Sequence, residues 1–226
     1  MFYRLVITSR ILLGIVLSAG SVAAQHPAQP ADSQGDFRQP LWEVGPYVGV
    51  SLHSPVGTHL GVTPDRDHLF LGVHITANFL RRRRWSFAYA PEIVPLLLVT
   101  NNIEFRRPGT VTRRDPGLYE QRPVAGFAVS PIGLETQIRV TPRWRVYGAG
   151  AAGAVWFTRD VPVPGARAFN YTFEFGGGVQ WRYRARDSLR VGYKFHHLSN
   201  AFTAPLNPGI DAEVFLVGFD RALGSR

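Results

Sequence analysis

Long runs of alternating apolar and polar residues are the feature that most constrains the fold of this chain. The clearest run covers residues 168–184. One side of an extended strand there carries apolar side chains: Phe169, Tyr171, Phe173, Phe175, Val179, Trp181 and Tyr183. The other side carries polar ones: Asn170, Thr172, Glu174, Gln180 and Arg182. Because successive side chains of a β-strand point to opposite sides, this segment predicts a strand with one apolar face and one polar face.

The same period of two recurs from Leu41 onward. We expect eight β-strands, at residues 41–53, 68–80, 85–99, 124–140, 144–158, 168–184, 188–200 and 211–220. Most have 12 residues or more, whereas soluble strands average about 5–6 residues and a membrane strand needs about 9–11. Charged residues on the polar faces suit a wet or hydrogen-bonded barrel interior. The pattern favours an all-β fold, an eight-stranded antiparallel transmembrane β-barrel of the bacterial outer membrane.

The connections between these strands alternate in length. Three are tight turns, at residues 81–84, 141–143 and 185–187, and four are longer, at 54–67, 100–123, 159–167 and 201–210. Outer-membrane barrels have short periplasmic turns and longer outer loops, so we expect the N-terminus on the periplasmic side. Five aromatic residues then fall at the periplasmic rim, where an interfacial belt belongs: Trp42, Trp85, Trp144, Trp181 and Tyr183.

Two prolines, Pro91 and Pro95, interrupt the third expected strand. A central strand tolerates proline poorly because proline lacks the N–H that the hydrogen-bond ladder needs. We therefore expect a bulge or a local break at this point of the barrel wall.

Both ends of the chain fall outside the expected barrel, which covers residues 41–220. Residues 1–24 have a basic start, an apolar stretch and a small-residue cleavage site ending at Ala24, as in a secretory signal peptide. Residues 25–40 are polar and contain proline, so we expect a flexible leader. Residues 221–226 are expected to form a C-terminal tail. The chain has no cysteine, which excludes disulfides and thiolate chemistry.

Arginine supplies nearly all the positive charge in a chain of formal net charge +9. The arginines form no helix face and no RNP-like motif, so we expect no nucleic-acid partner. The run Arg81–Arg84 falls in a periplasmic turn, where it is expected to touch phospholipid headgroups. The pairs Arg106–Arg107 and Arg113–Arg114 fall in a long outer loop. They are interpreted either as an ordinary basic loop or as a contact for the phosphates of an anionic glycolipid.

One stretch near the C-terminus departs from the pattern. The apolar face of residues 188–200 includes His197 and Ser199, which are two positions apart and therefore side by side. Polar groups on a lipid-facing side cost free energy unless they are satisfied, and function is expected at such exceptions. A serine beside an imidazole, with an acid to orient the base, is the arrangement that activates a nucleophile. The competing interpretation is a rim histidine and serine that alternate by chance.

The residues around this pair resemble those of a known family. The string Phe195-His196-His197-Leu198-Ser199-Asn200-Ala201, followed by Asn207-Pro208-Gly209-Ile210-Asp211, is similar to the motif of the lipid A 3-O-deacylases of bacterial outer membranes (PagL-type). The specific similarity covers about the last 30 residues of the chain. The resemblance implies an eight-stranded barrel with a His-x-Ser-Asn motif on its penultimate strand and an acid after a short loop.

The resemblance also implies a role for each residue of the motif. Ser199 looks like the nucleophile, His197 like its general base and Asp211 like the acid that orients the imidazole. Asn207 matches a position implicated in stabilising the oxyanion, and Asn200 is its companion.

Two positions depart from the family's pattern. The family's acid is often glutamate, and Asp211 is one methylene shorter, so Glu213 on the same face is the alternative acid. A glycine often found shortly after the Ser-Asn pair, whose backbone N–H completes the oxyanion hole, is replaced here by Phe202.

The function implied by the resemblance is that of an outer-membrane serine esterase. It would remove the 3-O-linked acyl chain of lipid A and release a 3-hydroxy fatty acid. The partner would be lipopolysaccharide in the outer leaflet, with no cofactor, and the remaining histidines show no metal spacing. The alternatives are a non-enzymatic eight-stranded barrel with a structural or adhesion role, a related hydrolase of phospholipids or small acyl esters, and a soluble lipocalin-like carrier. The oligomeric state, a homodimer included, stays open.

Overall fold

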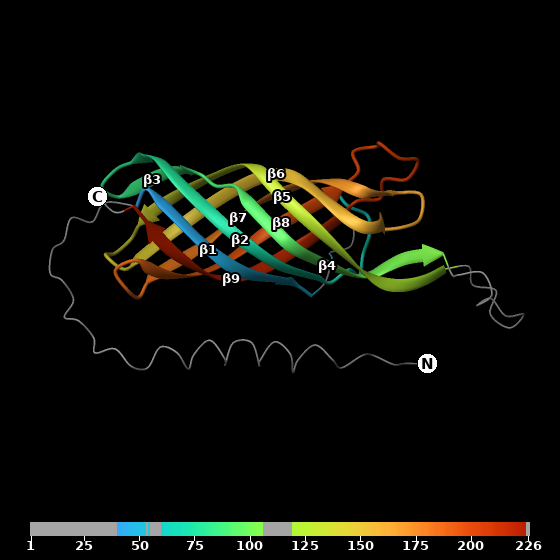
Figure 1. Cartoon of the computed structure of the whole chain (residues 1–226), viewed down its shortest axis with the longest axis horizontal. Coiled ribbons are helices and arrows are strands. Elements are labelled where there is room, and N and C mark those ends of the chain that lie inside the picture. Colours follow the sequence, from blue (N-terminus) through green and yellow to red (C-terminus); the bar gives the residue numbers. More distant parts are fainter. Residues whose placement is uncertain (1–39, 53, 55–59, 106–118, 225–226) are drawn as a thin grey trace, which may run out of the picture. The chain divides into compact units, whose positions relative to one another are not determined.

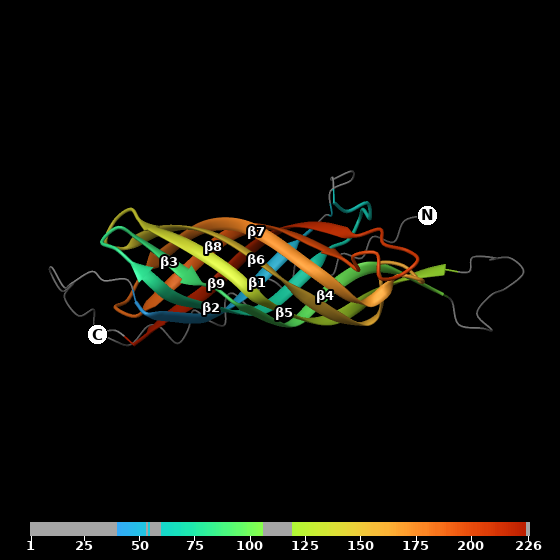
Figure 2. The same ribbon diagram turned by 90° about the horizontal axis from the view of Figure 1, so that it is seen from above.

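The structure is a computed structural model that describes residues 40–52, 54, 60–105 and 119–224. In these residues it contains nine β-strands: β1 (Trp42–Ser51), β2 (His68–Arg81), β3 (Trp85–Tyr89), β4 (Glu92–Phe105), β5 (Tyr119–Arg139), β6 (Trp144–Val161), β7 (Arg167–Arg182), β8 (Asp187–Ser199) and β9 (Ile210–Leu223). All pairings are antiparallel, and β1 pairs with both β2 and β9. The sheet therefore closes on itself into a barrel of tilted strands (Figures 1 and 2).

The third expected strand is split in two. β3 ends at Tyr89 and β4 begins at Glu92, with Ala90 and Pro91 between them. Both pieces pair with β2 on one side and with β5 on the other, so they occupy one position in the barrel wall. The register to β5 shifts between Val94 and Leu97, around Pro95. The prolines thus produce both a break and a bulge, and the wall has the eight strand positions that the sequence predicts.

Several boundaries differ from those expected from the sequence. β4 extends to Phe105 and β5 begins at Tyr119, and these two strands project beyond the rest of the barrel (Figure 1). At the other end β9 continues to Leu223, so residues 221–223 belong to the wall rather than to a tail. The expected signal peptide, residues 25–39 of the leader, and the pairs Arg106–Arg107 and Arg113–Arg114 lie outside the described residues.

Apolar side chains cover the outside of the barrel, and polar side chains fill much of its inside. In β7, Phe173 and Phe175 are 47% and 52% exposed, whereas the alternating residues Thr172 and Glu174 are buried. A water-soluble protein would show the opposite arrangement. This polarity and the closed antiparallel sheet are those of an outer-membrane β-barrel.

No helix in the described part of the chain is long and apolar enough to cross a membrane.

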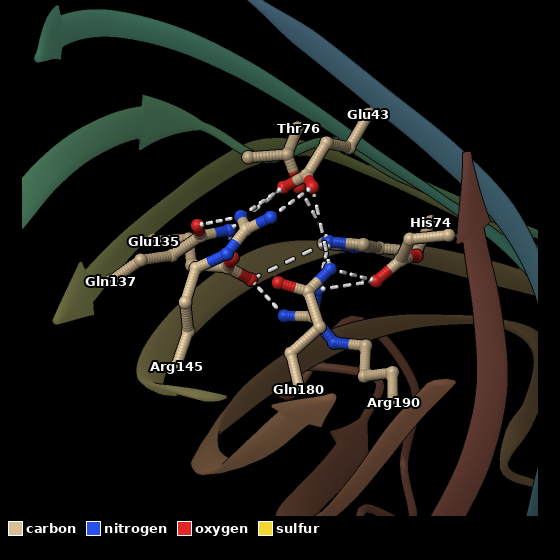
Figure 3. Close-up of polar contacts among 9 residues, drawn as sticks. Glu43, His74, Thr76, Glu135, Gln137, Arg145, Gln180 and Arg190 are labelled. Atoms are coloured by element: carbon tan, nitrogen blue, oxygen red, sulfur yellow. Dashed lines mark hydrogen bonds and ion pairs between the residues drawn. The ribbon is translucent and has the colours of Figure 1, made fainter. Parts of the chain in front are cut away.

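The half of the interior nearer the short turns contains a connected group of polar side chains, which we call the interior ionic network (Figure 3). Its members are Glu43, His74, Thr76, Glu135, Gln137, Arg145, Gln180, Arg190 and Asp220. The Arg145 guanidinium donates to both carboxylate oxygens of Glu43, at 3.0 Å each. Arg190 donates to Glu135 and, at 3.3 Å, to Asp220. These charges are buried but paired, as burial requires.

The other half of the interior is mainly apolar. A cluster of buried side chains there includes Phe70, Leu97, Val99, Val124, Val155, Phe157, Leu198, Ile210 and Val214. Between the two halves, Lys194 Nζ lies 2.7 Å from Glu92 and 2.8 Å from Glu174. Leu198 and Ile210 are opposite each other in the β8–β9 register and are fully buried. The apolar half of the core therefore fixes the ends of β8 and β9 from the inside.

The aromatic residues expected at the periplasmic rim do lie together at the end of the barrel that carries the short turns. Trp144 and Trp181 are register partners, and their rings stack with centroids 6.1 Å apart. Trp42 and Trp85 are exposed at the starts of β1 and β3, and Tyr183 is exposed directly after the end of β7. This arrangement is that of an interfacial aromatic belt.

Candidate active site

The predicted site residues lie where β8 ends and β9 begins. His197 and Ser199 are at the end of β8, and Asp211 is at the start of β9. Residues 200–209 connect these two strands at the end of the barrel opposite the short turns. His197 and Asp211 are register partners, so their side chains leave the sheet on the same face.

His197 and Asp211 are joined by a hydrogen bond. Nδ1 of His197 lies 2.5 Å from Oδ1 of Asp211. The other carboxylate oxygen, Oδ2, accepts a hydrogen bond of 2.9 Å from the backbone N–H of Gly61, in the β1–β2 loop. The Asp211 side chain is fully buried, and that of His197 is 14% exposed. The acid is thus held on two sides, and the imidazole keeps Nε2 for a second partner.

Glu213, the alternative acid, lies farther along the barrel wall. It is opposite Phe195 in the register and is exposed. The shorter side chain of Asp211 reaches His197 because the two residues face each other directly across neighbouring strands.

Ser199 is half-buried and is opposite Tyr171 on β7. It lies on the same side of β8 as His197, as the alternation predicts. Within the residues that the structure describes, no hydrogen bond joins the Ser199 hydroxyl to the imidazole. Hydrogen bonds between a catalytic base and its nucleophile often tighten only when substrate is present.

Two asparagines organise the loop after Ser199. Oδ1 of Asn207 accepts a 2.9 Å hydrogen bond from the backbone N–H of Asn200, which leaves the Asn207 amide N–H₂ group as a donor. Nδ2 of Asn200 donates to the carbonyl of Leu206 at 2.7 Å. Asn200 is buried, and its hydrogen bonds stabilise the conformation of the loop.

The chain reverses direction immediately after Asn200. The N–H of Thr203 donates to the carbonyl of Asn200 at 3.1 Å, which closes a tight turn around Ala201 and Phe202. Both central residues have positive φ, 50° and 60°. Phe202 therefore has the left-handed backbone that glycine adopts at least cost. Its side chain is 86% exposed.

Two glycines shape the site, although the sequence pattern assigned no role there to either. A Cβ on Gly61 would lie 2.8 Å from the backbone N of Asp211. Gly209 has φ of 58°, and a Cβ there would lie 3.3 Å from Cε1 of His197. Gly209 belongs to the motif that resembles the deacylases, but Gly61 lies 150 residues before Asp211 in the chain, and no pattern near it points to this contact.

Within the described ranges, no group of three His, Cys, Asp or Glu side chains is arranged to hold a metal ion. The chemistry available to the site is that of the serine, the imidazole, the buried carboxylate and the amide donors of the loop.

The sequence profile of the lipid A 3-O-deacylase (PagL) family matches residues 125–220, which include all the predicted site residues. The resemblance to this family is confirmed. The crystal structure of the outer-membrane enzyme PagL superposes with a TM-score of 0.50 at 12% sequence identity, covering 80% of this chain and 99% of PagL. The outer membrane protein OprG from Pseudomonas aeruginosa gives a TM-score of 0.50 at 11% identity, covering 83% of this chain and 98% of OprG. At such identities the PagL and OprG structures show the fold alone, an outer-membrane β-barrel. A comparison with curated protein sequences finds no match.

Proposed function

We propose that this protein is a serine esterase of the outer membrane that hydrolyses the 3-O-linked acyl ester of lipid A. The observation that carries the proposal is the contact of His197 with the buried Asp211, two positions along the same face from Ser199. The match to the lipid A 3-O-deacylase profile supports the substrate class.

In the first half of the reaction, Nε2 of His197 takes the proton of the Ser199 hydroxyl as Oγ attacks the ester carbonyl. Asp211 accepts from Nδ1–H, which keeps the imidazole in the required tautomer and stabilises its protonated form. The carbonyl oxygen becomes an oxyanion, and the Asn207 amide group is the donor proposed to stabilise it, at a worth of about 3–4 kcal/mol. The sugar oxygen then leaves with the proton from His197, and the acyl chain remains on Ser199.

In the second half, water replaces the sugar. His197 takes a proton from the water as its oxygen attacks the acyl carbonyl, and then returns a proton to Oγ of Ser199. The products are a 3-hydroxy fatty acid and lipid A with a free 3-hydroxyl group. No external co-reactant besides water is needed.

The surroundings of the pair suit an acyl substrate. Tyr171 and Phe173 are the β7 register partners of Ser199 and His197, and their side chains are 48% and 47% exposed on the lipid-facing side. They offer an apolar wall along which an acyl chain can lie. The site lies at the rim opposite the short turns, which is the outer rim in this class of barrels, so the outer leaflet is within reach.

The purified protein in detergent micelles tests this proposal. It is incubated with lipid A that carries 3-O-acyl chains and, separately, with a diacyl phospholipid, and the products are identified by mass spectrometry. We expect release of a 3-hydroxy fatty acid from lipid A, and a rate lower by at least about 10³-fold in Ser199→Ala. Ser188→Ala, on the same strand but near the short turns, is the matched control and should keep full activity.

Two results would contradict the proposal in different ways. Faster hydrolysis of the phospholipid than of lipid A would indicate the related phospholipid hydrolase. Equal, background rates for the wild type and Ser199→Ala on both substrates would indicate a non-enzymatic barrel.

A further inference from the structure

Exposed arginines surround the end of the barrel that carries the short turns. In the described residues they are Arg81, Arg82, Arg83, Arg84, Arg143, Arg184, Arg186 and Arg221. We call this set the arginine rim. Its members come from the end of β2, from the β2–β3, β5–β6 and β7–β8 connections and from the last strand. These connections gather at one end of the barrel (Figure 1, left).

Backbone hydrogen bonds join the turns that carry the arginine rim. The N–H of Arg139 donates to the carbonyl of Arg84 at 2.7 Å. The N–H of Arg182 donates to the carbonyl of Arg143 at 2.8 Å, and the N–H of Ala222 donates to the carbonyl of Arg186 at 2.7 Å. The arginines are therefore mounted on a continuous, hydrogen-bonded edge of the sheet rather than on independent loops.

The arginine rim has few counter-charges of its own. Arg221 lies 3.7 Å from Asp187, the first residue of β8. The side chains of Arg82, Arg83, Arg84, Arg143 and Arg186 make no ion pair within the described part of the chain. At the opposite end of the barrel, by contrast, two of the described arginines are paired: Arg122 lies 3.0 Å from Glu120, and Arg159 contacts Glu104. Within the described residues, the arginine rim therefore carries more positive charge than its ion pairs balance.

The position of these charges relative to the membrane indicates what neutralises them. Arg84 directly precedes Trp85, and Arg143 directly precedes Trp144, both members of the aromatic belt. A tryptophan belt lies at the level of the lipid headgroups, so the arginines lie at or just beyond the headgroup phosphates. Guanidinium groups match phosphate with paired hydrogen bonds.

We propose that the arginine rim binds anionic phospholipid headgroups of the inner leaflet of the outer membrane. The probe of choice is phosphatidylglycerol, whose uncharged glycerol headgroup leaves the negative charge of the phosphate unbalanced. The binding fixes the height of the barrel in the membrane and is separate from the chemistry at Ser199, which lies at the other rim.

Native mass spectrometry of the full chain in neutral detergent tests the proposal by titration with phosphatidylglycerol or with zwitterionic phosphatidylethanolamine. We expect the wild type to bind phosphatidylglycerol at least about tenfold more tightly, with a preference that weakens as salt rises. Replacing Arg81, Arg82, Arg83 and Arg84 together by glutamine should abolish most of this preference. The control is the triple variant Arg122→Gln, Arg159→Gln, Arg167→Gln at the opposite rim, which should keep it.

Three outcomes would overturn the proposal. The first is that the wild type binds the two lipids equally well. The second is that the variants at both rims lose the preference for phosphatidylglycerol to the same extent. The third is that soluble glycerol phosphate displaces phosphatidylglycerol at the same concentration as the lipid itself. Circular dichroism must show that each variant is folded. If the fourfold variant does not fold, Arg143→Gln with Arg186→Gln is the second test, because these side chains lie on two other turns of the same rim.

Discussion

His197 on β8 and Asp211 on β9 face each other directly across two neighbouring strands, with Nδ1 and Oδ1 2.5 Å apart. The strand register itself therefore sets the contact between the proposed base and the proposed acid. Leu198 and Ile210, the adjacent register partners, are fully buried in the apolar core and hold both strands in place. A catalytic pair mounted on strands is more precisely positioned than one mounted on loops.

The first prediction concerns the acid. Asp211→Asn keeps the size of the side chain but removes the charge that stabilises protonated His197, so we expect the rate of lipid A deacylation to fall by about 10²–10⁴-fold. Glu213→Gln alters an exposed residue opposite Phe195 and should change the rate by less than about threefold. Steady-state rates of both variants decide between the two acids. A larger loss in Glu213→Gln would mean that the acid has been misassigned.

The second prediction concerns Gly61. Its N–H donates to Asp211, and a Cβ there would lie 2.8 Å from the backbone of Asp211. Gly61→Ala should displace the carboxylate and lower the rate by about 10–100-fold, because small displacements of catalytic groups are costly. Gly150→Ala on β6 is the matched control, since the nearest atom to a Cβ there is 3.7 Å away. Wild-type activity in Gly61→Ala would show that the β1–β2 loop does not position the acid.

The third prediction concerns the turn after Asn200. Phe202 has φ of 60°, a conformation that costs about 1–2 kcal/mol for a residue with a Cβ. Phe202→Gly should therefore raise the free energy of unfolding by about 1 kcal/mol, as measured by urea titration in lipid vesicles. Phe202→Ala keeps the Cβ and separates backbone strain from loss of the aromatic ring. The strain account is untenable if the glycine and alanine variants are equally stable.

The fourth prediction concerns the interior ionic network. Arg190 is buried between Glu135 and Asp220, and Arg190→Met leaves two carboxylates without their cation. Removing one partner of a buried ion pair costs about 3–5 kcal/mol, so the urea midpoint should fall markedly. Arg159→Gln removes an exposed pair with Glu104 and should cost less than about 1 kcal/mol. Equal stabilities of the two variants would argue that the network does not hold the barrel together.

The fold was largely predictable because a barrel wall repeats one simple rule. Each strand alternates between lipid and interior, and a one-residue slip would reverse every side chain, so the alternation alone assigns the faces of β7 and β8. Pro91 and Pro95 signalled an irregularity, but not that one produces a break and the other a bulge. The ends of β4, β5 and β9 were missed because strand ends depend on pairing with a neighbour rather than on local pattern.

The site was predictable only in part. His197 and Ser199 stood out as polar residues on an apolar face, and the motif indicated Asn207 and Asp211. The sequence could not choose between Asp211 and Glu213, because both fall on the same face and the choice depends on which residue is opposite His197. The role of Gly61 could not be predicted, because its contact with Asp211 joins residues 150 positions apart in the sequence.

The mass of lipid A in living cells tests the central claim most directly. Outer membranes are taken from a bacterium whose lipid A carries 3-O-acyl chains and that produces either this protein or Ser199→Ala at equal levels, and the lipid A is examined by mass spectrometry. We predict that lipid A from cells with the wild-type protein loses the mass of one 3-hydroxyacyl chain, and that lipid A from cells with Ser199→Ala stays intact. Identical lipid A masses in the two strains would contradict the account.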